Sequence, residues 1–200
     1  MRLKSASYFL FGFVMSIFFS CHENMAHSNR VIDIQPFNDL SPSIIKTVYE
    51  RLKEINPNTI LKTALPIPEK VFYPLRKRYN AESLISYLNP FGSSDTVIIG
   101  MTSKDISTTK NSISDWGIMG LAYCPGNACV VSAFRLSKTN LSEQFYKVVI
   151  HELGHTQGLP HCINKTCFMS DAEGGNYLDE EKEFCLSCKS LLKSKGWRLN

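Results

Sequence analysis

The spacing of apolar residues switches repeatedly between the two-residue period of strands and the longer period of helices. Residues 31–37 (VIDIQPF) alternate as a strand does. Residues 41–56 place apolar side chains at helical spacing between a Ser-Pro start and an Asn-Pro stop, which predicts a helix. Residues 59–68 (TILKTALPIP) are short and apolar with prolines behind them, so we expect another strand.

The same alternation continues to the end of the chain. The next expected elements are a helix over 75–89, a buried strand over 96–102, and two strands over 117–123 and 128–134 joined by the turn CPGN. Residues 140–155 predict a helix with Asn140 at its N-cap, and residues 179–195 predict a final helix. This order predicts an α/β (α+β) domain with the 140–155 helix under a mixed sheet.

Length and composition are those of one globular domain. The chain has 200 residues, of which 44% are hydrophobic and 20% charged, so it can form a full core and is not of the disordered class. The net charge is +4, and its basic residues are scattered rather than clustered. We therefore expect no nucleic-acid partner.

The first 20 residues differ in character from the rest. Arg2 and Lys4 precede an apolar run, residues 8–19, that is too short to span a bilayer comfortably. This pattern predicts a signal peptide over residues 1–20 and hence export. An apolar strand or helix, or a membrane anchor that is left in place, is the alternative.

The end of this apolar run, FFSC, resembles a bacterial lipobox, although its two phenylalanines depart from the stricter pattern. The resemblance implies that Cys21 becomes lipid-modified and that residues 21–29 form a tether to a domain over 30–200. We then expect a membrane-anchored lipoprotein that faces the periplasm or the cell surface. Plain cleavage or retention of the signal peptide is the alternative.

Candidate chemistry is concentrated in residues 151–162 (HELGHTQGLPHC), which hold three of the five histidines. His151 and His155 are four apart and lie on one face of a helix, so both can bind one Zn²⁺. Glu152 lies beside them and can reach a water on the metal without being a ligand. This is the H-E-x-x-H arrangement of metallopeptidases.

The residues after the helix supply a third ligand. Gly158 accepts a positive φ, so the helix can end there and the chain can swing His161 back toward the metal. Three protein ligands leave one position open for water, which is typical of catalytic zinc. Structural histidines on a surface helix are the alternative, and the long fixed spacing argues against it.

Beyond the third histidine the chain has the pattern C-x-x-x-x-C-x-M and a later C-x-x-C. The residues concerned are Cys162, Cys167, Met169, Cys185 and Cys188. Together with the histidine motif this resembles the archaemetzincins, a family of zinc metallopeptidases in the metzincin clan. Residues 72–85, 97–106 and 120–136 are similar to that family as well. The interval between Met169 and Cys185 is shorter than in the family pattern, which puts the conformation of this loop in doubt.

The resemblance implies a metzincin-like mixed sheet over an active-site helix, with the C-terminal segment held by a structural zinc on the four cysteines. Four thiolates can close a tetrahedral site around such an ion. Two disulfides among the same four cysteines are the alternative, since an exported protein meets oxidising conditions. The resemblance also implies that Met169 lies in the turn beneath the catalytic zinc; plain core filling is the alternative.

Two cysteines remain. Cys124 and Cys129 flank the PGNA turn at a separation across which a hairpin disulfide can form. We treat this pair as a candidate disulfide.

These features predict a zinc-dependent metallopeptidase with two Zn²⁺ per chain, one catalytic and one structural. In this reading Glu152 assists the attack of zinc-bound water on the peptide bond. The resemblance implies aminopeptidase-like action on short peptides that pair with an edge strand within 117–127. We expect a peptide or protein substrate and a monomer.

A zinc-stabilised peptide-binding lipoprotein with little turnover is the main alternative, although a pure binder would not need Glu152. A third hypothesis is a conventional metzincin endopeptidase, but the four cysteines argue against it.

Overall fold

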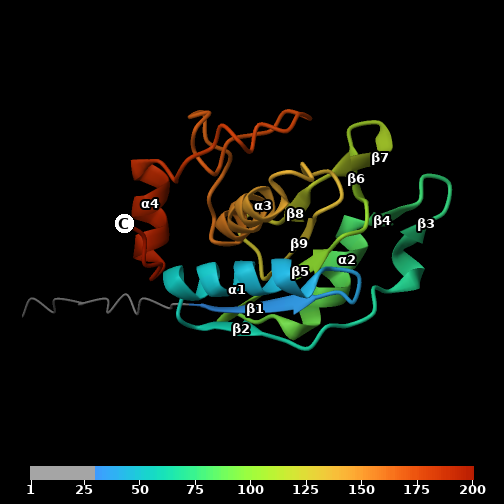
Figure 1. Cartoon of the computed structure of the whole chain (residues 1–200), viewed down its shortest axis with the longest axis horizontal. Helices are drawn as coiled ribbons and strands as arrows, with labels where there is room; N and C mark the ends of the chain where they lie inside the picture. Colours follow the sequence, from blue (N-terminus) through green and yellow to red (C-terminus); the bar gives the residue numbers. More distant parts are fainter. Residues whose placement is uncertain (1–29) are drawn as a thin grey trace, which may run out of the picture.

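A computed structural model describes residues 30–200 as one mixed α/β fold (Figure 1). The predicted signal peptide, Cys21 and the tether lie outside the described residues. Within residues 30–200, no helix has the length and apolar character needed to cross a bilayer.

A five-stranded sheet forms the centre of the fold, in the order β2-β1-β5-β9-β8. Its strands are β1 (Val31–Pro36), β2 (Thr59–Leu61), β5 (Thr96–Thr102), β8 (Gly120–Ala122) and β9 (Ala128–Ser132). Strands β2, β1, β5 and β9 run parallel to one another, and β8 runs antiparallel to β9 at the edge. The predicted mixed sheet is therefore confirmed, and the outer edge of β8 carries no partner within the described part of the chain.

Helices cover both faces of this sheet, because successive side chains of a strand point to opposite faces. Ile32 and Ile99 face α1 (Pro42–Ile55) and α3 (Leu141–Thr156) in one buried cluster. Ile98 and Val130 face α2 (Ala81–Leu88) in a second cluster. Burial on both faces explains why the predicted strand at 96–102 has a continuous apolar run over residues 97–101 and no alternation with polar residues.

A second, four-stranded sheet extends beyond the first in the order β3-β4-β6-β7. It consists of β3 (Phe72–Tyr73), β4 (Arg78–Asn80), β6 (Ile106–Lys110) and β7 (Ile113–Ile118). The helix expected over 75–89 is therefore wrong in its first half. Asn80 is the N-cap of α2, and its side chain accepts a hydrogen bond from the Ser83 amide at 2.8 Å, so the helix starts only at residue 81.

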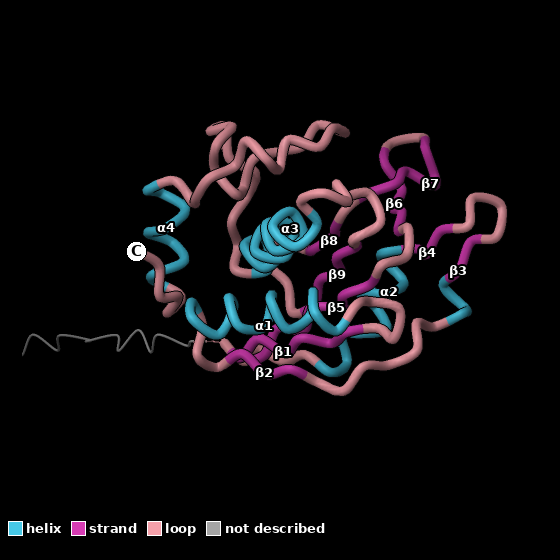
Figure 2. Tube along the Cα trace, viewed as in Figure 1, coloured by secondary structure: helices cyan, strands magenta, loops and turns pink. Residues whose placement is uncertain are grey.

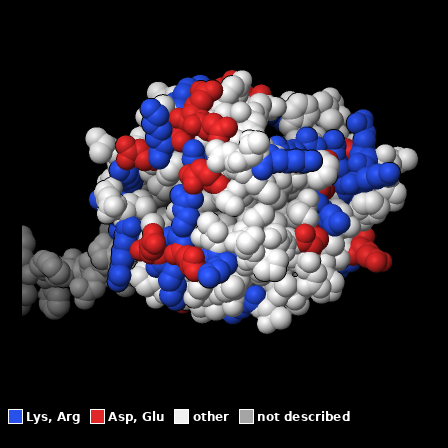
Figure 3. Space-filling view, viewed as in Figure 1, with Lys and Arg blue, Asp and Glu red and all other residues white. Residues whose placement is uncertain are grey.

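The C-terminal quarter of the chain is mainly loop (Figure 2). The last helix, α4 (Leu186–Ser194), begins after Cys185, so the expected helix over 179–195 is wrong in its first part. Asn140 occupies the N-cap position of α3 as predicted, but its side chain makes no capping hydrogen bond and its amide donates to Asp179 Oδ1 at 2.6 Å. Residues 157–185 thus contain no named helix or strand, and they run beside α3 and above it in the view of Figure 2. Acidic and basic side chains are interspersed over α1 and α4 (Figure 3).

The core between α3 and the sheet predicts the effect of one truncation. Phe145 has 0% exposure on α3. We expect Phe145→Ala to lower the free energy of unfolding of the metal-loaded protein by about 3–5 kcal/mol, because it leaves a cavity under the active-site helix. Ser142→Ala on the exposed side of the same helix should change it by less than about 0.5 kcal/mol. Urea unfolding followed by circular dichroism measures both, and equal effects would contradict this packing.

Candidate active site

Three histidine side chains converge at the C-terminal end of α3. His151 and His155 lie one turn apart on the helix, and their Nε2 atoms are 3.0 Å apart. His161 follows after the helix has ended, and one nitrogen from each of the three rings lies within 4.8 Å of the others. The structure therefore brings together the three ligands that the spacing predicted.

The rings of His151 and His155 are each oriented by a hydrogen bond at Nδ1. His151 Nδ1 donates to Phe168 O at 2.7 Å, and His155 Nδ1 donates to Leu159 O at 2.7 Å. Since Nδ1 carries the proton in both rings, Nε2 keeps its lone pair for a metal. Burial is the main cause that lowers the pKa of His151 to about 3, and the nearby His155 is the second cause. This imidazole is therefore neutral at neutral pH.

The helix ends where the sequence predicted. Gly158 has φ +99°, and its amide donates to His155 O at 2.9 Å. The Leu159 amide then donates to Gly154 O at 3.1 Å, which closes the end of the helix. This left-handed turn directs Leu159 O toward the His155 ring and leads the chain to His161.

His161 has an acidic neighbour that the sequence did not indicate. Its Nδ1 lies 3.4 Å from Asp171 Oδ2, at the exposed rim of the cluster. A hydrogen bond from the Glu173 amide is the main cause that lowers the pKa of Asp171. An ionised carboxylate beside a metal-binding histidine holds the ring and increases the basicity of its other nitrogen. No motif links positions 161 and 171, because the loop between them sets the contact.

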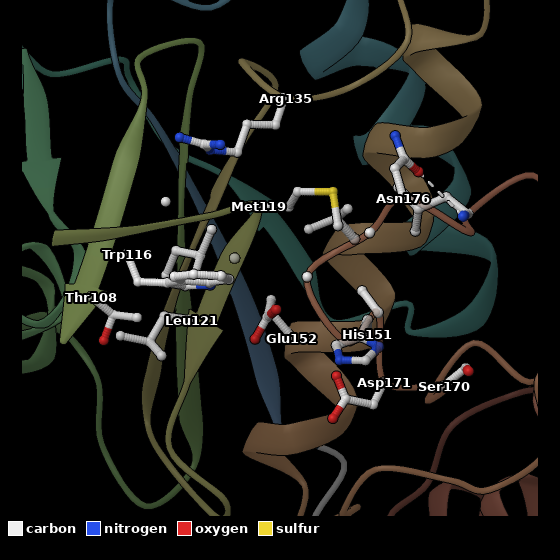
Figure 4. Close-up of a pocket in the computed structure, with 18 of the residues that line it drawn as sticks. Thr108, Trp116, Met119, Leu121, Arg135, His151, Glu152, Ser170, Asp171 and Asn176 are labelled. Carbon is white, nitrogen blue, oxygen red and sulfur yellow. Dashed lines mark hydrogen bonds between the residues drawn. The ribbon is translucent and has the colours of Figure 1, made fainter. Parts of the chain in front are cut away.

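Glu152 projects from α3 beside the histidines into a cleft (Figure 4). It is 7% exposed, and burial raises its pKa to about 8. It lies close against β8, since a Cβ atom on Gly120 would lie 2.5 Å from Glu152 Oε1. Glycine at position 120 therefore makes room for the carboxylate next to the metal-binding rings.

Met169 is fully buried and packs against α3 at Gly154. A Cβ atom on Gly154 would lie 2.5 Å from its Sδ atom, so the helix and the methionine are in close contact. Met169 O accepts a hydrogen bond from the Cys162 amide at 2.7 Å. The location agrees with the turn that the family resemblance implied.

The four C-terminal cysteines form a second cluster, in which the four sulfur atoms lie within 4.8 Å of one another. All four are free thiols, and Cys162 Sγ lies 3.7 Å from Cys185 Sγ, well beyond the S–S bond length of about 2.05 Å. The alternative of two disulfides is therefore not what the structure shows. The Ser187 hydroxyl is the main cause that lowers the pKa of Cys185 to about 6, which favours the thiolate that zinc binds.

The candidate disulfide between Cys124 and Cys129 is wrong, because both residues are free thiols. Cys129 is buried in β9 and lies opposite Ala122 in the hairpin. Cys124 lies beyond the paired residues and donates from Sγ to Leu159 O at 3.2 Å. The turn therefore directs the two thiols to different neighbours.

The cleft at the histidines has a volume of about 660 Å³. Trp116 and Leu121 line it on the side of β7 and β8, and Asn176 and Asp171 line it on the opposite side, with Glu152 between (Figure 4). Sequence reasoning missed this second side. The one available signal was Lys147, a charged residue within the apolar run FYKVVI of α3.

Comparisons with known proteins agree with this site. The sequence model described as peptidase family M54 matches residues 23–194. An archaemetzincin from Haloquadratum walsbyi is 30% identical over 176 residues, which cover 81% of this chain and 99% of that protein. The crystal structure of the Methanopyrus kandleri archaemetzincin superposes with a TM-score of 0.71 at 28% identity, covering 84% of this chain and 96% of that one. The archaemetzincin of Archaeoglobus fulgidus, crystallised with malonate, gives a TM-score of 0.69 at 27% identity, with coverages of 80% and 98%.

Because Gly154 contacts Met169, we expect a glycine-to-alanine substitution in α3 to lower stability, which is the opposite of its usual effect in a helix. Alanine favours a helix over glycine by about 1 kcal/mol. We nevertheless expect Gly154→Ala to destabilise the metal-loaded protein by about 1–3 kcal/mol, because the buried Met169 sulfur must move. The measurement is urea unfolding of the single variants and of the Gly154→Ala/Met169→Ala double variant. A gain in stability for Gly154→Ala, or strictly additive effects, would contradict the contact.

Proposed function

Because this chain belongs to peptidase family M54 and is therefore a zinc metallopeptidase, we propose that it hydrolyses peptide bonds with Glu152 as general base and acid. The convergence of three imidazoles, two of which are fixed by hydrogen bonds from Nδ1 to main-chain carbonyl groups, with a buried carboxylate beside them, carries this proposal. The donor set fits zinc, because neutral imidazoles are its common ligands in catalytic sites.

The protein's own groups account for binding and proton transfer. His151, His155 and His161 would hold the zinc, which when bound acidifies a water and polarises a carbonyl group. Glu152 takes the proton from the attacking water and delivers it to the leaving amine as the C–N bond breaks. Its burial supports this role, since a carboxylate that is poorly solvated accepts a proton readily.

The substrate is a peptide, and we propose that it lies along β8. That strand is at the edge of the five-stranded sheet and lines the cleft through Gly120 and Leu121. Its free backbone groups can pair with an extended peptide, which would lie across Glu152. Aminopeptidase-like action on short peptides is the mode that the family resemblance supports, and we retain it as part of the proposal.

We further propose a second zinc on Cys162, Cys167, Cys185 and Cys188. Four sulfur atoms within 4.8 Å of one another suit a closed tetrahedral site, which stabilises and does not catalyse. Cys162 directly follows His161, so this ion would fix the loop that supplies the third histidine.

Attachment to the membrane is a proposal that rests on the sequence. The lipobox-like Ser20-Cys21 supports a lipid on Cys21, export of the protein, and a position at the periplasmic or outer cell surface. In this proposal residues 30–200 form a monomeric peptidase domain behind the tether.

The proposed role of Glu152 predicts that its replacement stops peptide hydrolysis and leaves zinc binding intact. Glu152→Gln should retain the zinc content of the wild type and lose hydrolysis by about 10²–10⁴-fold, because the proton acceptor is gone while the ligands stay. The measurement is metal analysis together with cleavage of a mixture of short peptides. A variant as active as the wild type would refute the mechanism, and a wild type that binds peptides without cleaving them would favour the peptide-binding alternative.

The four-cysteine site predicts a zinc count. We expect two zinc per chain in the purified wild type, one in Cys188→Ser, and one in His155→Ala. Cys188→Ser should also lower the melting temperature markedly, because the loop from residue 162 to 185 loses its cross-link. Cys124→Ser is the matched control, since this thiol lies outside the cluster, and it should keep two zinc. A count of two in Cys188→Ser would contradict the assignment.

A further inference from the structure

A segment that is bound along α3 forms the side of the cleft opposite β8. This wall segment, residues 170–181, is held by hydrogen bonds with one residue that precedes α3 and with two residues in the first half of α3. The bonds join Asn140 to Asp179, Gln144 to Asn176, and Lys147 to the carbonyl oxygens of Leu178 and Glu181. Because α3 also carries the metal-binding histidines, the wall segment has a fixed position relative to the reacting bond.

Glu181, at the end of the wall segment, is a buried acid with an incomplete set of partners. It lines the cleft and is only 5% exposed. Its Oε2 atom is buried and receives no hydrogen bond. A buried carboxylate without a partner is unfavourable, so such a group is explained best by a ligand that completes it. Burial raises the pKa of Glu181 to about 8.

Lys147 lies close enough to oppose part of the rise that burial causes in the pKa of the Glu181 carboxyl, but it makes no hydrogen bond to the Oε2 atom of that carboxyl. Lys147 Nζ donates to Leu178 O at 2.7 Å and to Glu181 O at 2.6 Å, so its hydrogen bonds go to the main chain. Among residues 30–200 no ion pair joins Lys147 to the Glu181 carboxylate. Arg135, another cation of the cleft, is bound by Asp105 through two bonds of 2.8 Å.

The surroundings of Glu181 suit a long side chain with an apolar stem. Val148 lies on α3 one turn before Glu152, and it lines the cleft together with Met119 and Leu178. A substrate residue adjacent to the scissile bond can therefore pass between apolar groups before it meets the carboxylate. This combination fits lysine or arginine, whose methylene chains pack on apolar surface while their charged ends pair with an acid.

We propose that Glu181 determines specificity by binding the ammonium or guanidinium group of a lysine or arginine next to the scissile bond. The inference rests on the proposed peptidase function and names the class of peptide that the site selects. Glu181 makes no contact with the metal-binding residues among the hydrogen bonds of the described chain, so it is a binding group and takes no part in proton transfer.

Two sets of matched peptides test this proposal. Each set carries lysine or norleucine, which lacks the ammonium group, at one of the two positions that flank the cleaved bond. In the zinc-loaded wild type we expect kcat/KM for the lysine peptide to exceed that for the norleucine peptide roughly 10- to 100-fold at one of these positions. In Glu181→Gln this ratio should fall to near one. Glu180→Gln, an exposed neighbour, should keep the wild-type ratio.

A binding measurement distinguishes this proposal from the peptidase function itself. In the Glu152→Gln background, calorimetry should give tighter binding of the lysine peptide than of the norleucine peptide, and the added Glu181→Gln substitution should remove the difference. Loss of turnover in every protein with retained lysine preference would refute the peptidase function and support the role of Glu181. Equal binding and equal kcat/KM for the two peptides in the wild type, or a lysine preference that survives Glu181→Gln, would overturn the proposal.

Discussion

The hydrogen bonds from two imidazole Nδ1 atoms to main-chain carbonyl groups are the constraint on which the site depends. Helix α3 alone places His151 and His155 on one face, but it does not decide which nitrogen each ring presents. Phe168 O and Leu159 O make that choice, and both belong to the loop that follows the helix. The loop must therefore have its native path before the histidines can act together as ligands.

That path is fixed at three places along the chain. The left-handed turn at Gly158 sets the direction in which the loop leaves α3. Met169 then packs against Gly154. The four-cysteine cluster joins the start of the loop at Cys162 to its end at Cys185, so a metal there would act on the catalytic site through Cys162 and its neighbour His161. Structural and catalytic ligands thus share one short segment.

The two sides of the cleft offer different kinds of binding group to a substrate. The β8 side offers backbone groups at a sheet edge and leaves room for Glu152 through Gly120. The opposite side offers side chains, which hydrogen bonds from α3 hold in place. Backbone pairing is insensitive to sequence, whereas a buried acid such as Glu181 is selective. The two sides can therefore supply affinity and specificity separately.

The sequence by itself determined the local chemistry: the ligands His151, His155 and His161, the acid Glu152, the break at Gly158 and the buried run of β5. Each of these follows from spacing or residue type within a few positions, where helix and strand geometry leave little freedom. The sequence was less reliable in two places: it predicted a helix over residues 75–80, where the chain forms a turn and β4, and a disulfide between Cys124 and Cys129, which are free thiols. Only the tertiary structure decided that Asp171 meets His161, that α3 holds the wall segment, and that Glu181 lines the cleft with its Oε2 atom unbonded. These contacts join residues through loops, whose path depends on packing against α3 and not on any period in the chain.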